Sequence, residues 1–290
     1  VDHDTVKGTK RDDILKGDAA YNLIDGDLGF DTVIFSGEQK SYTLQLSQSG
    51  STIIDRRPSQ DGTNALIDIE NLQFADAQFN IDRFSGVTDL SDAQFAAITE
   101  LYIAYFDRAP AAQGLSYWAT RLDDGMTLPQ IAKSFFVQPE TQNTYAAYLN
   151  EDGSVANTQD FVTAVFNNVL GRDPTGLYWM NELDRPDSDI TPDKFILAVL
   201  NGAKAESGGA ADVAYLETKT DIGLYFSAIK GLSDYDDTVS VIDIYDGTAV
   251  SVNNAVAEID RIYAEALDPN TGGFLMPLVG VIDDPFAGMW

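Results

Sequence analysis

The chain has 290 residues, 44% of them hydrophobic, and its 46 acidic and 18 basic residues give a formal net charge of −28. This length allows two domains, and the 15 Phe, 13 Tyr and 3 Trp residues supply the apolar surface that disordered chains lack. The charge argues against nucleic acid and anionic membranes as partners, and the absence of Cys excludes disulfides and thiolate metal sites.

A nine-residue repeat occupies the segment from Asp4 to Phe35. An acidic or amide residue recurs at every ninth position, and an aliphatic residue follows it two positions later. The polar series is Asp4, Asp13, Asn22 and Asp31, and the aliphatic series is Val6, Leu15, Ile24 and Val33. A glycine opens three of the units, at positions 8, 17 and 26. This period is typical of a coil of short strands joined by tight turns.

Each unit is expected to make half a turn, with its aliphatic residue in a narrow core and its glycine in the turn. Alternate units then stack on the same side, which places Asp13 beside Asp31 and Asp4 beside Asn22. Carboxylates brought together in this way repel unless a cation lies between them. Calcium prefers carboxylate and backbone carbonyl oxygens as ligands. The repeat therefore predicts calcium sites between the turns.

This repeat resembles the glycine- and aspartate-rich calcium repeat of RTX (hemolysin-type) secreted proteins, which forms a parallel β-helix. The resemblance covers about residues 4–82, including a strand-rich flank that commonly closes such repeats. The sequence departs from the family pattern at Lys10, Arg11, Ala19, Ala20 and Tyr21, where the family prefers small residues or glycine, and at Asn22, which replaces a ligand Asp.

We therefore expect one good calcium site, at Asp13 and Asp31, and a weaker one at Asp4 and Asn22. The full candidate metal set is Asp4, Gly8, Lys10, Asp12, Asp13, Asn22, Gly26, Asp27, Leu28 and Asp31. The alternative is an acidic, glycine-rich loop that holds no metal.

The resemblance also implies export by a type I route, in which the chain leaves the cell unfolded and folds outside, where calcium is plentiful. A secreted or cell-surface location is therefore expected, and a cysteine-free intracellular protein is the alternative. No segment reaches the ~18 apolar residues of a membrane span, and no signal peptide is visible. Because the sequence begins with Val1, it suggests a processed or truncated product.

The region after the repeat reads as further strands near residues 41–46, 51–55 and 65–69. Arg56 and Arg57 are expected on the solvated surface. The hydrophobic period then changes from two to 3.6 at Leu90, so we place a β domain at 1–86 and a helical domain at 87–290. The expected fold class is two-domain α+β, with a small β-roll or sandwich-like calcium domain followed by an all-α bundle.

Helices are expected to begin after the capping residues Ser91 and Thr127 and at Pro192. Further helices are expected near residues 114–124, 140–149, 211–230, 234–245 and 252–267. The apolar tail after residue 273 is expected to pack on the bundle or to meet a partner.

The helical part contains its own repeat. The segment YIAYFDRAP (102–110) aligns with FNNVLGRDP (166–174) at an offset of 64, and GLSYW (114–118) aligns with GLYW (176–179). These segments resemble a tandem helical domain of bacterial secreted and surface-layer-type proteins, of unassigned function and distantly similar to phycobilisome linker domains. The resemblance covers about 97–206, with repeats at about 91–150 and 157–206. It implies a helical bundle and offers no catalytic residues.

Within this repeat, Arg108 and Arg172 are expected to donate to helix C-terminal carbonyls or to a carboxylate. Trp118 and Trp179 are expected to pack in the core, and stacking against a sugar is the alternative reading.

Catalytic motifs are absent from the sequence. His3 is the only histidine, and no zinc-protease, serine-hydrolase or phosphate-loop pattern occurs. Adjacent carboxylates such as Asp123 and Asp124 could serve a glycosidase, but surface solvation explains them in so acidic a chain.

The sequence thus predicts a secreted, calcium-binding, non-enzymatic surface or matrix protein. Its partners would be copies of itself, a cell-surface polysaccharide or another surface protein. The alternatives are a carbohydrate-binding protein or carbohydrate-active enzyme with its site on the helical part, and an acidic protein adapted to high salt.

Overall fold

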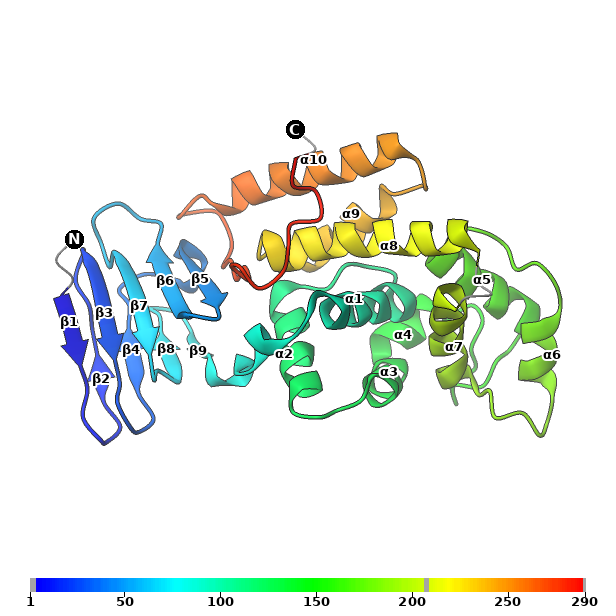
Figure 1. Cartoon of the computed structure of the whole chain (residues 1–290), viewed down its shortest axis with the longest axis horizontal. Coiled ribbons are helices and arrows are strands. Elements are labelled where there is room, and N and C mark those ends of the chain that lie inside the picture. The colour runs from blue at the N-terminus through cyan, green and yellow to red at the C-terminus, as the bar shows by residue number, and fades with distance from the viewer. Residues whose placement is uncertain (1–3, 206–208, 289–290) are drawn as a thin grey trace.

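The protein has an α+β architecture, as expected from the sequence. The computed structural model describes residues 4–205 and 209–288. Two mixed β-sheets form one end of the molecule and the helices form the rest (Figure 1). The strands are β1 (Asp4–Lys7), β2 (Ile14–Leu15), β3 (Tyr21–Asp25), β4 (Thr32–Ile34), β5 (Tyr42–Ser47), β6 (Gly50–Asp55), β7 (Thr63–Ile67), β8 (Asn71–Gln73) and β9 (Gln78–Asn80).

The nine-residue repeat forms the coil that its spacing predicts. Strand β1 pairs in parallel with β3, with Asp4 opposite Asn22, and β2 pairs in parallel with β4, with Ile14 opposite Thr32. Successive half-turns therefore alternate between the two sheets, and one full turn takes 18 residues. The aliphatic residues Ile24 and Val33 are completely buried between the sheets. The prediction of stacked half-turns is confirmed.

A third turn of the coil comes from outside the repeat. Strand β7 pairs in parallel with β3, and β8 pairs in parallel with β4, so residues 63–73 continue the stack. The antiparallel hairpin of β5 and β6 lies between the second and third turns in the sequence and extends the first sheet. Strand β9 extends the second sheet.

The C-terminal tail joins the two halves of the molecule. It runs in parallel beside β5, the last strand of the first sheet (Figure 1). The Leu44 amide donates to the Leu275 carbonyl (2.8 Å), the Leu46 amide donates to the Pro277 carbonyl (3.0 Å), and the Val279 amide donates back to Leu46 (2.8 Å). The tail thus covers the β5 edge with backbone hydrogen bonds rather than only packing on the bundle.

Arg56 fixes this junction, and the expectation that it is a solvated surface residue is wrong. Its guanidinium donates to the carbonyls of Tyr42 (2.6 Å) and Gly273 (2.6 Å) and also to the Lys40 carbonyl. Burial lowers the pKa of this guanidinium. Arg57 is also held, by the carboxylates of Asp55 and Asp61. The sequence shows only two consecutive arginines beside a turn. It does not reveal that the C-terminal tail brings a backbone carbonyl to Arg56.

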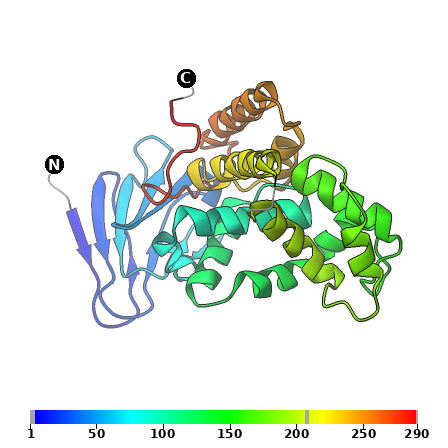
Figure 2. The ribbon, with the colours of Figure 1, turned by 45° about the vertical axis from the view of Figure 1, so that its right-hand side comes forward.

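The helical part is built around α1 (Asp92–Phe106). Its remaining helices are α2 (Ala112–Asp123), α3 (Leu128–Phe136), α4 (Pro139–Thr144), α5 (Thr158–Leu170), α6 (Tyr178–Asp184), α7 (Pro192–Lys204), α8 (Ala210–Leu224), α9 (Tyr235–Asp243) and α10 (Ala249–Ala266). Helices α8 and α10 run alongside each other across the top of the bundle (Figures 1 and 2). None of the helices in the described ranges is long and apolar enough to cross a membrane.

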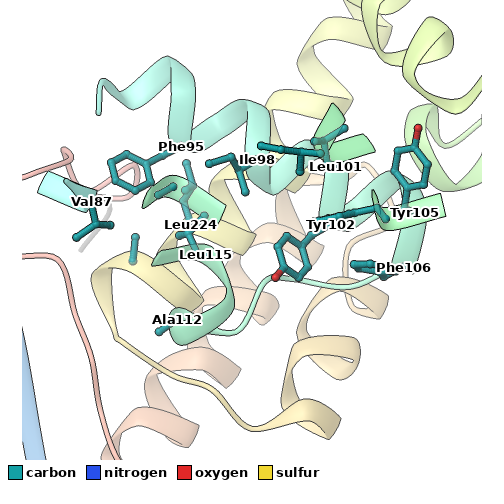
Figure 3. Packing of buried hydrophobic residues seen from close by; sticks show 14 of the residues in the cluster. Val87, Phe95, Ile98, Leu101, Tyr102, Tyr105, Phe106, Ala112, Leu115 and Leu224 are labelled. Carbon is teal, nitrogen blue, oxygen red and sulfur yellow. The ribbon is translucent and has the colours of Figure 1, made fainter. Parts of the chain in front are cut away.

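Helix α1 is buried on most of its circumference because α2, α3, α7 and α8 all pack against it. Figure 3 shows Phe95 and Ile98 reaching toward α2 and α8, while Tyr102 and Phe106 follow on later turns. The hydrophobic core is continuous from the β coil to these helices. A helix with so little exposed surface cannot show the one-sided pattern of an amphipathic surface helix.

One predicted helix is shorter than expected. The segment 140–149 was expected to be helical to about Leu149, but α4 ends at Thr144. The buried Tyr145 hydroxyl donates to the Ala104 carbonyl (2.6 Å), and Leu149 then pairs with Val155 as an isolated bridge. Anchoring of Tyr145 in the core turns the chain out of the helix.

Replacing Arg56 by Ala should destabilise the protein by about 2–3 kcal/mol, because the junction carbonyls lose a charged donor inside the structure. Urea denaturation followed by circular dichroism measures the change. Arg185→Ala is the control, since that side chain is 56% exposed. Equal unfolding midpoints for both variants would contradict the role of Arg56.

Candidate metal centre

Three carboxylates stack on one side of the coil, one from each turn. The Asp13 amide donates to Asp31 Oδ1 (2.8 Å), and the Asp31 amide donates to Glu70 Oε2 (2.6 Å). Asp13 Oδ2 in turn accepts from the amide of Thr9 (2.6 Å). Each carboxylate therefore accepts a backbone amide from the preceding turn or its own turn. The expected proximity of Asp13 and Asp31 is confirmed by this ladder.

Asp31 is the residue of this ladder whose carboxylate is not fully hydrogen-bonded. It has no exposed surface, and its Oδ2 has no hydrogen-bond partner among the described residues. Its carboxylate lies between those of Asp13 and Glu70 in the stack. Burying an unpaired anionic oxygen is expensive unless a cation or a donor reaches it.

Two glycines leave the space in which a cation could reach these oxygens. A Cβ on Gly26 would lie 2.5 Å from Asp31 Oδ2 and 2.1 Å from the Asp68 carbonyl oxygen. A Cβ on Gly8 would lie 3.1 Å from Asp13 Oδ2 and 2.4 Å from the Gly26 carbonyl oxygen. Each glycine therefore faces one carboxylate oxygen and one carbonyl oxygen, one turn of the coil apart. Any side chain there would occupy this oxygen-lined space.

The other predicted metal residues lie on the same turns with different contacts. Asp12 Oδ1 accepts from the Phe30 amide (2.9 Å), which ties the two turns together. Asp27 adopts a left-handed conformation with φ of 69°, and its amide donates to Asp25 Oδ1 (3.0 Å). Lys10 and Leu28 are exposed on the turns. These four residues shape the turns, and their side chains do not contact Asp31 Oδ2.

The opposite side of the coil holds amides in place of carboxylates. Asp4 lies opposite Asn22, as expected, and Asn22 lies opposite Asn64 in the third turn. Asn22 Nδ2 donates to Asn64 Oδ1 (3.0 Å), and Asn64 Nδ2 donates to the Asp61 carbonyl (2.9 Å). Asp4 is exposed. This amide ladder is held together by its own hydrogen bonds, and the weaker calcium site expected at Asp4 and Asn22 stays a prediction.

The donors on the carboxylate side fit calcium by type. All are carboxylate or carbonyl oxygens, which calcium binds in sets of six to eight with water completing the shell. Across residues 4–205 and 209–288, however, no three Asp, Glu, His or Cys side chains converge closely enough to hold a metal by themselves. A calcium ion here would thus rely on Asp31 Oδ2 together with backbone carbonyls such as that of Asp68.

Sequence reasoning missed the third turn. Glu70 occupies the acidic position, Asn64 the amide position, and Asp68 the position of Gly8 and Gly26. The signal was present, because Asn64 and Glu70 each precede an aliphatic residue by two positions, as in the repeat. The pattern was not recognised because Asn64 and Glu70 are six residues apart rather than nine and follow the β5–β6 hairpin.

Acidic residues elsewhere in the described chain have structural roles. Asp234 caps α9 by accepting from the amides of Asp236 (3.0 Å) and Asp237 (3.3 Å). Arg108 pairs with Glu140 (2.5 Å), and Arg172 pairs with Asp212 (2.5 Å), in line with the expected carboxylate partners.

Comparison with known proteins finds one family, which matches slightly less than a quarter of the chain. A family model described as a domain of unknown function (DUF4214) matches residues 77–145, which hold β9 and helices α1 to α4. No curated protein and no solved structure matches the chain. The matched segment thus contains the first helical repeat, whereas the β coil and the second repeat lie outside it.

Gly26→Ala should destabilise the coil by about 1–3 kcal/mol, because its new methyl group would overlap the Asp68 carbonyl and Asp31 Oδ2. Gly273→Ala is the matched control, since a Cβ there meets nothing within 4 Å. Thermal unfolding compares the two variants, and an unchanged midpoint for Gly26→Ala would show that the space is not restrictive.

Proposed function

We propose that this chain is a calcium-binding protein of the cell exterior, in which calcium has a structural rather than a catalytic role. The observation that carries the proposal is the fully buried Asp31 carboxylate, whose Oδ2 has no protein partner within the described ranges. Asp31 would hold the ion, with the carbonyl of Asp68 beside it in the space that Gly26 leaves open. Calcium would supply the positive charge that this carboxylate stack lacks.

The chain's own residues then couple ion binding to folding. In an unfolded chain Asp13, Asp31 and Glu70 are far apart and solvated, whereas the coil stacks them on adjacent turns. Their repulsion opposes the last step of coil formation until a cation is present. Because the complete site exists only in the folded coil, calcium stabilises the fold by mass action.

An extracellular setting follows from the same requirement. A site that needs calcium to fold remains unformed where calcium is scarce and forms where it is abundant. The net charge of −28 also favours an exterior rich in divalent cations, which screen self-repulsion. The resemblance of residues 4–82 to RTX repeats supports the same setting. We propose that the helical part mediates assembly with other copies or attachment to a surface polysaccharide or protein.

Calcium should fold chelator-treated protein. At a free calcium concentration 100 times the dissociation constant, it should raise the free energy of unfolding by about 2.7 kcal/mol. Extracellular calcium-binding modules have dissociation constants near 10⁻⁴–10⁻³ M. Calcium titration followed by circular dichroism and urea denaturation measures the effect.

Asp31→Asn should remove most of this response, because the amide supplies a weaker ligand and no charge. Asp283→Asn, at an exposed position, should retain the response. If sodium chloride at matched ionic strength replaced calcium fully in the unmodified protein, salt adaptation would explain the acidity and the proposal would fail.

A further inference from the structure

The two helical repeats share one frame, which allows their corresponding residues to be compared directly. Helices α1 and α5 end in left-handed caps at Asp107 and Gly171, and helices α3 and α7 begin after Thr127 and Thr191. Both pairs are 64 residues apart. Counting from the two threonines, α3 and α7 bury side chains at the same four positions: Ile131, Ala132, Phe135 and Phe136 in α3, and Phe195, Ile196, Val199 and Leu200 in α7.

In the first repeat, Phe135 fills the space between these helices. Its ring lies 4.6 Å from that of Phe106, 5.0 Å from that of Tyr102 and 5.1 Å from that of Trp118, and it is fully buried. Figure 3 shows Tyr102 and Phe106 on α1. Trp118 in this repeat therefore packs, partly buried, against the core, as the packing interpretation predicts.

In the second repeat, the corresponding position borders a cavity, although the ring of Phe195, the counterpart of Ile131, packs 5.5 Å from that of Trp179. Val199 stands where the first repeat has Phe135, and a cavity of about 560 Å³ is lined by Val199 and by the counterparts of the residues around Phe135. These counterparts are Phe166 for Tyr102, Leu170 for Phe106, and Trp179 for Trp118. The small residues Gly202 and Ala203 complete the wall on α7. Helices α5, α6 and α7, which supply most of its lining, lie at the end of the molecule farthest from the β coil (Figure 1).

The cavity combines aromatic faces with accessible polar groups. Trp179 and the largely exposed Tyr178 lie on one wall, and the Arg172–Asp212 ion pair lies on another. The Arg172 side chain is 37% exposed, whereas its counterpart Arg108 in the first repeat is only 10% exposed. Arg172 is therefore available to a ligand in a way that Arg108 is not.

We propose that this cavity binds a neutral pyranose unit of a glycan. The C–H faces of a sugar ring pack against indole and phenol rings, while its hydroxyls exchange hydrogen bonds with paired guanidinium and carboxylate groups. The volume lies within the usual range of about 300–1,000 Å³ for ligand sites. Arg172 and Asp212 neutralise each other, and the chain around them is strongly acidic, so an anionic glycan gains no charge partner and meets repulsion. The site is separate from the calcium turns and does not depend on them.

Filling the cavity or removing an aromatic side chain that lines it should weaken binding while preserving the fold. Val199→Phe restores the residue type of the first repeat, and Tyr178→Ala removes an aromatic side chain that is 63% exposed, so its loss should leave the fold intact. Cellotetraose, maltotetraose and chitotetraose serve as probes in calorimetric and ligand-observed NMR titrations of the calcium-treated full chain. At least one should bind the unmodified protein, and both variants should weaken its binding at least tenfold, which is about 1.4 kcal/mol.

Leu177→Ala is the matched control, because Leu177 is 66% exposed, precedes Tyr178 and does not line the cavity. Its affinity should be unchanged. The proposal is overturned if none of the three oligosaccharides binds at about 10 mM, if the folded Tyr178→Ala variant binds as tightly as the unmodified protein, or if oligogalacturonate binds more tightly than the neutral probes. Circular dichroism establishes that each variant is folded, so Tyr178→Ala decides the result if Val199→Phe does not fold.

Discussion

The buried carboxylate of Asp31 is the constraint on which the β coil depends. Its Oδ1 accepts an amide from one turn and its own amide donates to the next, while its Oδ2 has no hydrogen-bond partner among the described residues. The hydrogen bonds that set the register of three turns therefore bring three carboxylates together, one of them fully buried. Positive charge beside Asp31 would offset the cost of this burial, which links the register of the coil to the ion that we propose.

The two internal repeats show how one backbone frame can hold different side chains. In the nine-residue repeat, one side carries carboxylates and the other carries amides that hydrogen-bond to one another. In the helical repeat, the buried Phe135 of the first copy packs against three aromatic rings, whereas Val199 stands at that position in the second copy and lines a cavity. In both cases the frame is retained while the side chains inside it differ.

Sequence periodicity predicted the parts of the fold that depend on local patterns. The step of nine placed Asp13 beside Asp31 correctly, and the capping residues Ser91 and Thr127 located the helix starts. Features formed by distant segments were not predicted. Glu70 joins the ladder from beyond an inserted hairpin, and Arg56 is covered by a tail whose position depends on the whole bundle. The cavity could not be predicted from the sequence either. It becomes apparent when the buried positions of the two helical repeats are compared, and these positions are known only from the structure.

The pairing of the tail with β5 also determines when the sheet can be completed during folding. The Ser41 hydroxyl donates to the Pro269 carbonyl, a contact between residues 228 positions apart, and the adjacent backbone pairs bridge similar separations. Contacts of such long range form slowly, because a large loop must close before they contribute stability. Until then one edge of β5 is open, so a partly synthesised chain exposes unpaired backbone groups there and relies on its charge to remain unassociated.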